Sequence, residues 1–294
     1  MAIKRSSGEK VFDFVNVTAL GFLSLITLYP FIYVLFASVS DPAELMRHKG
    51  LMLAPFGVHF NSYKLVFANP ILLTSYANTI LYVVGGTSIS VFLTILGAYA
   101  FSRKGTLWGN AMMFFVVFTM WFHGGMIPYF LLVRDLGMFN SRLALVIPKA
   151  IVTYNLIVMR TAFQGVPVSL EESARIDGAN DLTIMFKIIL PLSMPVVAVI
   201  TLFYSVAQWN AWFDAMLFIN DRLLYPLQMI LREILILNST DSMMAGAASQ
   251  GDQIQIGETI KYATVIVATL PILFVYPFAQ KYFVKGVMVG AIKG

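Results

Sequence analysis

Six stretches of this sequence are long and apolar enough to cross a lipid bilayer, and they constrain the fold more than any other feature. The hydrocarbon core of a bilayer is about 30 Å thick, and a helix needs roughly 20 residues to cross it. Because hydrocarbon offers no hydrogen-bond partners, a spanning segment of this kind is expected to be helical. The sequence therefore predicts an all-α, polytopic membrane protein with a single transmembrane domain over residues 1–294. Its spans are expected at about 12–39, 76–101, 108–132, 143–163, 188–213 and 260–284.

Charged residues make up only 12% of the chain, whereas soluble domains carry about 25%. So few charges could not cover a soluble surface of this size, and lipid must cover much of it. This excludes a soluble enzyme, a nucleic-acid-binding protein and a disordered chain. The absence of cysteine excludes disulfides and thiolate metal sites. The first apolar run is too long for a signal-peptide core, and no small-residue cleavage site follows it, so we expect a retained anchor.

The distribution of basic residues favours a cytoplasmic location for both termini. Six spans place the two termini on the same side, and with that side inside, eleven of the 20 Lys and Arg residues lie inside. Cytoplasmic loops carry an excess of such residues. The short turn with Arg103 and Lys104, directly between two spans, is the strongest single indicator. In this topology the inner side carries the whole net charge of +5, and four of its six acidic residues lie in the loop 164–187.

Two large loops, 40–75 and 214–259, are expected outside, and both contain apolar residues that predict folded lids. Asp41-Pro42 and Asn61-Ser62 each place a capping side chain before a helical turn. The run 217–237 contains four charged residues and a proline, and its last apolar part is only a dozen residues long. We therefore predict a helix at the membrane interface, or one that enters it partway, rather than a seventh span.

The inner loop 164–187 carries the clearest local signals. Ser169 followed three residues later by Glu172 predicts a capping box at a helix start. Gly178 can adopt the left-handed conformation that ends a helix, so this helix is expected to be about two turns long. The loop thus predicts a short, rigid helix that lies across the membrane face and that a partner protein can bind. Downstream signals predict a helix restart at Asn180 or Asp181 and interruptions at Leu190-Pro191 and Pro195.

This loop resembles the coupling loop in the membrane subunits of binding-protein-dependent ABC importers. The family pattern is Glu-Ala-Ala, three residues, Gly, nine residues, then Ile-x-Leu-Pro. The sequence supplies Glu172-Ser173-Ala174, Gly178 and Ile188-Ile189-Leu190-Pro191 at matching spacings, with Ser173 in place of the first Ala. The resemblance covers nearly the whole chain and implies a type I ABC importer permease fold. It also implies that the loop docks on a separate ATPase subunit and transmits its closure, so that the loop and both termini face the cytoplasm.

The resemblance implies two sets of ATPase-contacting residues. For Glu172, capping and ATPase contact remain alternatives, whereas Glu171, Arg175 and Asp177 have no evident local role and are stronger candidates. The C-terminal run from Gly286 is similar to the tail of the second subunit of the maltose permease, which reaches the ATPase dimer. The expected coupling residues are Glu171, Glu172, Ser173, Ala174, Arg175, Asp177 and Gly178, and the expected tail contacts are Gly290, Ala291, Ile292 and Lys293.

The energy source is expected on another chain. A phosphate-binding G-x-x-x-x-G-K-[ST] loop is absent from the sequence, and no cytosolic segment is long enough for a nucleotide-binding domain. We therefore expect no catalytic residue, no metal and no cofactor on this chain, with ATP and Mg²⁺ on the partner ATPase. The resemblance implies a second permease subunit as a heterodimer partner, two ATPase subunits, an extracytoplasmic solute-binding protein and the bacterial cytoplasmic membrane. No nucleic-acid partner is expected.

Polar residues within the spans are candidates for the substrate path, because polar groups at membrane depth usually face a cavity or a partner helix. Lys149 follows Pro148, which can bend a helix. An ion pair with an acidic group of a partner subunit and snorkelling to the interface are alternatives for Lys149. Aromatic rings beside hydrogen-bonding groups suit sugars, although an ordinary aromatic belt is an equal alternative. The candidates are Lys149, Asn155, Trp209, Asn210, Trp212 and Asp214.

The sequence resembles the sugar-importing branch, and 209–213 and 225–228 resemble permeases for larger oligosaccharides, alginate importers among them. The expected function is half of an ATP-driven translocation path for a sugar or oligosaccharide, acidic ones such as alginate included, working by alternating access. An ion-coupled secondary transporter is the alternative. It should show inverted repeats and buried carboxylates, whereas these spans are nearly free of Asp and Glu. An intramembrane enzyme would need a catalytic signature that the sequence lacks.

Overall fold

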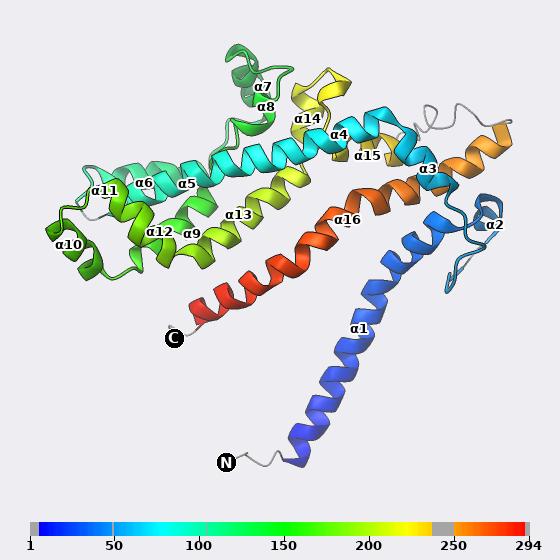
Figure 1. Ribbon diagram of the computed structural model, residues 1–294, viewed down its shortest axis with the longest axis horizontal. Helices are drawn as coiled ribbons and strands as arrows, with labels where there is room; N and C mark the ends of the chain where they lie inside the picture. Colours follow the sequence, from blue (N-terminus) through cyan, green and yellow to red (C-terminus); the bar gives the residue numbers. More distant parts are fainter. Residues whose placement is uncertain (1–5, 49, 104, 237–249, 292–294) are drawn as a thin grey trace. The chain divides into compact units, whose positions relative to one another are not determined.

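The computed structural model describes residues 6–48, 50–103, 105–236 and 250–291, and these ranges form helices and connecting segments without a strand (Figure 1). The all-α prediction is confirmed. The chain divides into two compact units, Met1–Asn69 with Glu233–Leu270, and Pro70–Arg232 with Pro271–Gly294. The sequence analysis treated the chain as one domain, because hydropathy identifies apolar helices without indicating which of them pack together.

The first unit is built on two long helices, α1 (Ser7–Val39) and the first part of α16 (Gln250–Ala291). A capping box of Ser6 and Glu9 starts α1. Most of α1 is apolar on all sides, and none of its most apolar 18-residue stretch is buried by the residues that the structure describes, as expected for a helix that faces lipid or another subunit. Its C-terminal end packs into a small core formed by Tyr33, Phe36, Ala37, Leu45, Met52, Phe56 and Tyr262.

The segment after α1 is folded, as predicted for this loop. Asp41 caps α2 (Pro42–Arg47) through the backbone amides of Ala43 and Glu44, which confirms that helix start. The predicted cap at Asn61 is wrong. Helix α3 (Asn61–Ala68) begins at Asn61 itself and has Phe60 at its N-cap position. The Asn61 side chain therefore lies within the first turn, where it does not cap the amides of that turn.

The second unit contains one long helix and many short ones. Helices α4 (Pro70–Leu81) and α5 (Thr87–Ser102) are joined by the π-helical turn η1 (Tyr82–Gly86) into a single 33-residue apolar helix. The unit also holds the last part of α16 and the beginning of α15 (Leu227–Ile236), which passes into the first unit after Arg232. The remaining elements are α6 (Gly109–Phe118), α7 (Met126–Asp135), α8 (Leu143–Val146), α9 (Thr153–Gln164), α10 (Val168–Ile176), α11 (Asp181–Ile184), η2 (Met185–Ile189), α12 (Leu190–Leu192), α13 (Met194–Trp209), α14 (Phe213–Phe218) and η3 (Arg222–Leu224).

The main core of this unit lies between α5, α9 and α13, which run side by side (Figure 1). Met159 and Phe163 of α9 and Ile200 of α13 are completely buried there. A polar link crosses the same core, since the hydroxyl groups of Thr94 and Tyr204 lie 2.8 Å apart. Burial of these large side chains joins the three helices into one packed body.

By length and composition, three helices among the described residues could cross a membrane: Gly8–Val39, Pro70–Ser102 and Gly257–Pro277. A fourth candidate consists of Asp181–Leu192 and Met194–Trp209, which meet at 85°. The bend lies at the interruptions predicted for Pro191 and Pro195, where proline removes backbone donors. The runs 108–132 and 143–163 are not continuous helices. They are broken near Gly125, which has a φ of 85°, and around Pro148. The number of six membrane spans therefore stays a prediction.

In the described part of the run 217–237, residues 217–236, no helix is long enough to cross a bilayer. Its α15 has ten residues and a length of about 15 Å. The segment before α15 is fixed to α4 and η1 by side-chain bonds to backbone. Asn78 Nδ2 donates to the carbonyl of Leu223 at 2.6 Å, Tyr82 donates to the carbonyl of Leu224, and Thr79 accepts from the amide of Leu227. This agrees with the prediction of a folded, non-spanning segment.

Candidate substrate cavity and coupling loop

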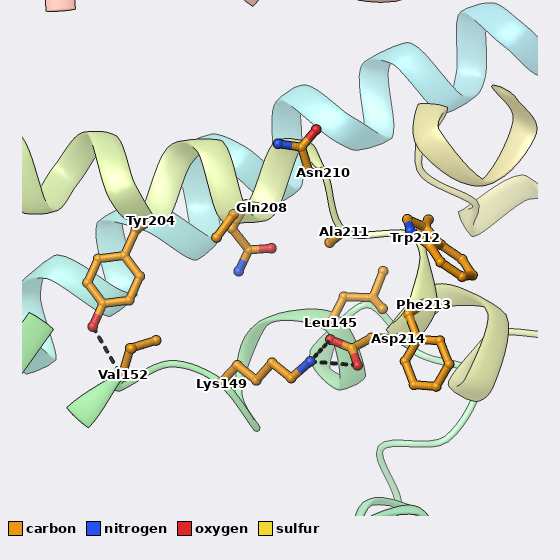
Figure 2. Close-up of a pocket in the computed structure, with 11 residues that line it drawn as sticks. Leu145, Lys149, Val152, Tyr204, Gln208, Asn210, Ala211, Trp212, Phe213 and Asp214 are labelled. Carbon is orange, nitrogen blue, oxygen red and sulfur yellow. Dashed lines mark hydrogen bonds and ion pairs between the residues drawn. The ribbon is translucent and has the colours of Figure 1, made fainter. Parts of the chain in front are cut away.

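A cavity of about 220 Å³ lies at the C-terminal end of α13, between α14 and the segment that connects α8 to α9 (Figure 2). The α13 helix ends at Trp209, and the chain turns there to begin α14. Eleven residues line the cavity: Leu145, Lys149, Val152, Tyr204, Ala207, Gln208, Asn210, Ala211, Trp212, Phe213 and Asp214.

An ion pair between Lys149 and Asp214 is the main electrostatic feature of this cavity. Lys149 Nζ lies 2.8 Å from Asp214 Oδ1 and 2.6 Å from Oδ2. The Asp214 side chain is only 11% exposed and lies in the first turn of α14, whereas the Lys149 side chain is 56% exposed. The start of a helix favours a negative charge. The carboxylate is therefore fixed, and the ammonium group has an open side.

Lys149 occupies the irregular segment after Pro148, so the predicted disruption of the helix at this point is present. Its partner is an acidic group of the same chain, whereas the sequence analysis considered an acidic group of a partner subunit. The ring of Tyr129 lies 6.0 Å from Lys149 Nζ, within the range of a cation–π contact. Lys149 is thus held by a carboxylate and faces an aromatic ring.

The other predicted path residues divide into two groups. Trp212 and Asn210 line the cavity, but Asn210 donates to the carbonyl of Val206 and points away from Lys149 in Figure 2. Trp209 and Asn155 do not line it: Asn155 is buried in α9, and Trp209 lines a separate, apolar cavity between α13 and α16. The structure therefore brings together Lys149, Asn210, Trp212 and Asp214, and leaves Asn155 and Trp209 outside the cavity.

Three residues at or beside the cavity were not among the predicted path residues: Gln208, Tyr204 and Tyr129. Gln208 is nearly buried against Gly86, where a Cβ atom would come within 2.9 Å of Gln208 Nε2. The Tyr204 hydroxyl accepts from the amide of Val152 at 3.0 Å. Tyr204 and Gln208 are four residues apart within an apolar run and so share one helix face, a signal that could have identified them. Tyr129 carries no comparable signal.

The coupling loop, residues 164–187, contains α10 as a two-turn helix. The predicted capping box is wrong, because Pro167 occupies the N-cap position and no side chain caps the helix start. Proline has a fixed φ suited to this position, so the helix begins early enough to place Ser169 inside its first turn. The other two signals are confirmed. Gly178 has a φ of 81° and ends the helix, and Asn180 caps α11 through the amide of Thr183.

The charged residues of this loop are extensively paired. Glu171, only 13% exposed, pairs with Arg103 and also accepts a hydrogen bond from Arg175 at 3.1 Å. Arg175 also contacts Asp181 at 2.5 Å. The hydrogen bond that Arg175 donates to Glu171 and the negative charge of Asp181 raise the pKa of Arg175. The expectation that Glu171 and Arg175 have no local role is therefore wrong.

A different face of α10 is open. The side chains of Glu172, Ser173 and Asp177 are exposed, and Ala174 is half-buried against the α5–α9–α13 core. Ile176 is 86% exposed, an apolar group on this face that the sequence analysis did not single out. In the tail, Gly290 and Ala291 end α16, and Ile292 and Lys293 lie outside the described residues.

The matches to known proteins extend over most of the chain. A sequence model of the family described as "Binding-protein-dependent transport system inner membrane component" matches residues 90–289. The chain belongs to this family. It is 43% identical to the polygalacturonan/rhamnogalacturonan transport system permease protein YtcP of Bacillus subtilis, over 97% of this chain and 99% of that one. Protein LplC of the same organism is 40% identical, over 97% and 96%.

A solved structure shares the fold. One chain of the crystal structure of a bacterial ABC transporter involved in the import of the acidic polysaccharide alginate has a TM-score of 0.86 and 34% identity. The match covers 96% of the present chain and all of that chain. The predicted type I permease fold is confirmed, and the chain is a non-enzymatic translocation subunit of an inner-membrane ABC importer. The ion-coupled alternative receives no support from these matches. No metal-binding group of three or more His, Cys, Asp or Glu side chains occurs in the part of the chain that the structure describes.

Proposed function

We propose that this permease forms half of the translocation path for oligosaccharides of acidic sugars. Two similar proteins support this substrate class. One is a transport protein for polygalacturonan and rhamnogalacturonan, and the other belongs to an importer of the acidic polysaccharide alginate. Such polysaccharides carry carboxylate groups along the chain. A path that conducts them needs cationic groups that the substrate can reach.

The Lys149–Asp214 pair is the observation that carries the proposal. A charge at membrane depth is costly unless it is paired, and Asp214 supplies the pair. The exposed side of Lys149 remains open to a substrate carboxylate. Trp212 lines the same cavity, and the Arg232 guanidinium lies 4.8 Å from the centre of its ring, so an aromatic group and a second cation adjoin this site. Because Asp214 already neutralises much of the Lys149 charge, a carboxylate would bind without being trapped. Conduction requires this balance between entry and release.

We also infer the composition of the working importer and its topology. This subunit would pair with a second permease subunit, two ATPase subunits that bind ATP and Mg²⁺, and an extracytoplasmic solute-binding protein. Both termini and the coupling loop would face the cytoplasm, where α10 meets an ATPase. The exposed face with Glu172, Ser173, Ile176 and Asp177 supports this contact, because it combines charges with an exposed apolar side chain. Alternating access would follow from ATPase closure.

The substrate class can be tested with the complete importer in proteoliposomes. Uptake of an oligogalacturonate is compared with uptake of the same oligosaccharide after chemical reduction of its carboxyl groups. Lys149→Met is expected to lower uptake of the acidic substrate about tenfold, since a hydrogen bond to a charged group contributes about 1.5–3 kcal/mol. Uptake of the reduced substrate should change little.

A matched control is available in this chain. Arg134 and Asp135 form an exposed ion pair with an N–O distance of 3.0 Å away from the cavity, and Arg134→Met should leave uptake of both substrates unchanged. An equal loss for the acidic and the reduced substrate in Lys149→Met would contradict a role in carboxylate recognition. Uptake of the acidic substrate by Lys149→Met at the rate of the unsubstituted protein would contradict this role as well.

A further inference from the structure

Arg103, at the C-terminal end of α5, connects three parts of the second unit. Its Nη1 pairs with the Glu171 carboxylate of α10, and its Nη2 donates to the Phe163 carbonyl of α9 at 3.1 Å. Its Nε donates to the Ser102 hydroxyl, and its guanidinium lies 5.1 Å from the centre of the Tyr99 ring. The planar guanidinium presents donors in fixed directions, so the position of Arg103 is determined by all of these contacts.

On α10, Glu171 is the ion-pair partner of Arg103. Its second oxygen accepts from Arg175, so both carboxylate oxygens are bound to guanidinium groups. No residue of α10 is fully buried, and Ala174 supplies a partial contact with the apolar core. Val166 and Ala179, at the two ends of α10, also pack against that core. Along α10 itself apolar burial is small, so the partly buried pair of Arg103 and Glu171, with side chains 17% and 13% exposed, supplies a main attachment of this helix to α5 and α9.

The helices that Arg103 contacts lead toward the cavity. Helices α5 and α9 pack along each other, and α5 is linked to α13 by the hydroxyl contact of Thr94 with Tyr204. Tyr204 lines the cavity and accepts from the amide of Val152, which precedes α9 and also lines the cavity. If α5 and α9 move with α10, the cavity residues Tyr204 and Val152 therefore move as well.

We propose that Glu171 is a positioning residue: its pair with Arg103 fixes α10 to α5 and α9. A movement of the ATPase then displaces α10 together with the packed helices α5, α9 and α13 as one rigid unit. The role is distinct from ATPase contact, because the carboxylate of Glu171 is turned toward the protein body. The inference rests on the proposed contact between α10 and an ATPase. It does not depend on the substrate class.

The first experiment measures ATP hydrolysis by the complete importer with and without substrate-loaded binding protein. Glu171→Gln keeps the size of the side chain and removes its charge. Basal hydrolysis should persist because it belongs to the ATPase subunits, while stimulation by the loaded binding protein should fall about tenfold, within the usual 5–150-fold range of coupling between sites. Ser169→Ala, on the same helix but without a capping bond, is the matched control and should retain full stimulation.

The second experiment detects positioning directly. The chain contains no cysteine, so spin labels can be attached at Val168→Cys on α10 and Phe92→Cys on α5, both exposed positions. The distance distribution between the labels should keep its width when ATP binds to the importer with Glu171 intact. In Glu171→Gln the distribution should broaden with ATP, because α10 then moves separately from α5.

The two measurements together decide the proposal. Loss of stimulation with broadening supports it, whereas loss without broadening, broadening without loss, or no change in either overturns it. Should Glu171→Gln fail to assemble, Arg103→Lys serves as the second variant. Lysine keeps the charge but cannot bond Glu171 and the Phe163 carbonyl with one planar group, so a smaller loss with the same broadening is expected.

A further variant separates this proposal from the proposed ATPase contact. Ile176→Asp places a charge on the exposed face of α10 and leaves the Arg103–Glu171 pair intact. If α10 contacts the ATPase but Glu171 does not position it, Ile176→Asp will lower stimulation and Glu171→Gln will not. If α10 does not contact the ATPase, neither variant will change stimulation.

Discussion

Two ion pairs in the second unit have similar chemistry and similarly covered carboxylates, but they differ in the exposure of their cations. In the cavity pair, Lys149–Asp214, the carboxylate is 11% exposed and the ammonium is 56% exposed. In the loop pair, Arg103–Glu171, the cation is 17% exposed and the carboxylate 13% exposed. A pair that is closed on both sides can only hold parts of the protein together. A pair whose cation is open can also exchange its partner with a ligand, so exposure of the cation distinguishes a structural pair from a candidate binding site.

The largest effect expected from this comparison is a loss of stability in Arg103→Ala. Removal of one partner of a buried ion pair leaves the other charge poorly compensated, which costs about 3–5 kcal/mol. Glu171 keeps its contact with Arg175, so we expect a cost of about 3 kcal/mol, measured as a lower thermal unfolding temperature of the purified importer.

The control for this prediction is Arg134→Ala, which breaks an exposed pair and should change stability by no more than about 1 kcal/mol. Equal, small effects of Arg103→Ala and Arg134→Ala would show that the loop pair is no more structural than a surface pair. The contrast with the cavity pair would then lose its basis.

The two pairs also mark the limit of what the sequence could predict. The cap at Asp41, the glycine that ends α10, and the bend near Pro191 and Pro195 depend on neighbouring residues, so local patterns identified them. Lys149 and Asp214 were each singled out as polar groups in apolar surroundings. Their contact spans 65 residues and that of Arg103 with Glu171 spans 68, and such pairings depend on helix packing that no local pattern contains.

The same limit explains the errors. Ser169 and Glu172 have the spacing of a capping box, but Pro167 starts the helix earlier and takes the N-cap position. Glu171 was expected to have no local role, yet Arg103 comes from a distant helix end to bind it, while its contact with an ATPase stays a prediction. A sequence pattern can thus show which residues have unusual chemistry, while tertiary packing decides which of them are available to a partner.

An intermediate effect is expected from Asp214→Asn, which removes the negative charge that pairs with Lys149. Without the carboxylate, Lys149 keeps its full charge for a substrate carboxylate, so an acidic oligosaccharide should bind more tightly and leave more slowly. Uptake in proteoliposomes should show a half-saturating concentration about threefold to tenfold lower and a lower maximal rate. An unchanged half-saturating concentration for the acidic substrate would indicate that Asp214 does not moderate the charge of Lys149.

The smallest effect is expected from Gly86→Ala, which tests whether the space beside the cavity pair matters for transport. The new Cβ would come within 2.9 Å of Gln208 Nε2 and 3.1 Å of its Cδ, so the amide of Gln208 must shift. Because Gln208 lines the cavity, we expect uptake to fall about twofold to threefold, a change of less than about 1 kcal/mol.

Gly85→Ala is the matched control, since a Cβ at that neighbouring position has no atom within 4 Å. Both substitutions replace glycine in the helical turn η1, where alanine is favoured by about 0.5–1 kcal/mol, so their intrinsic effects on helix stability should be alike. A difference in uptake between the two variants therefore reports on the position of Gln208 rather than on the helix. Equal uptake would mean that transport tolerates a displaced Gln208, and would contradict a role for the position of this side chain.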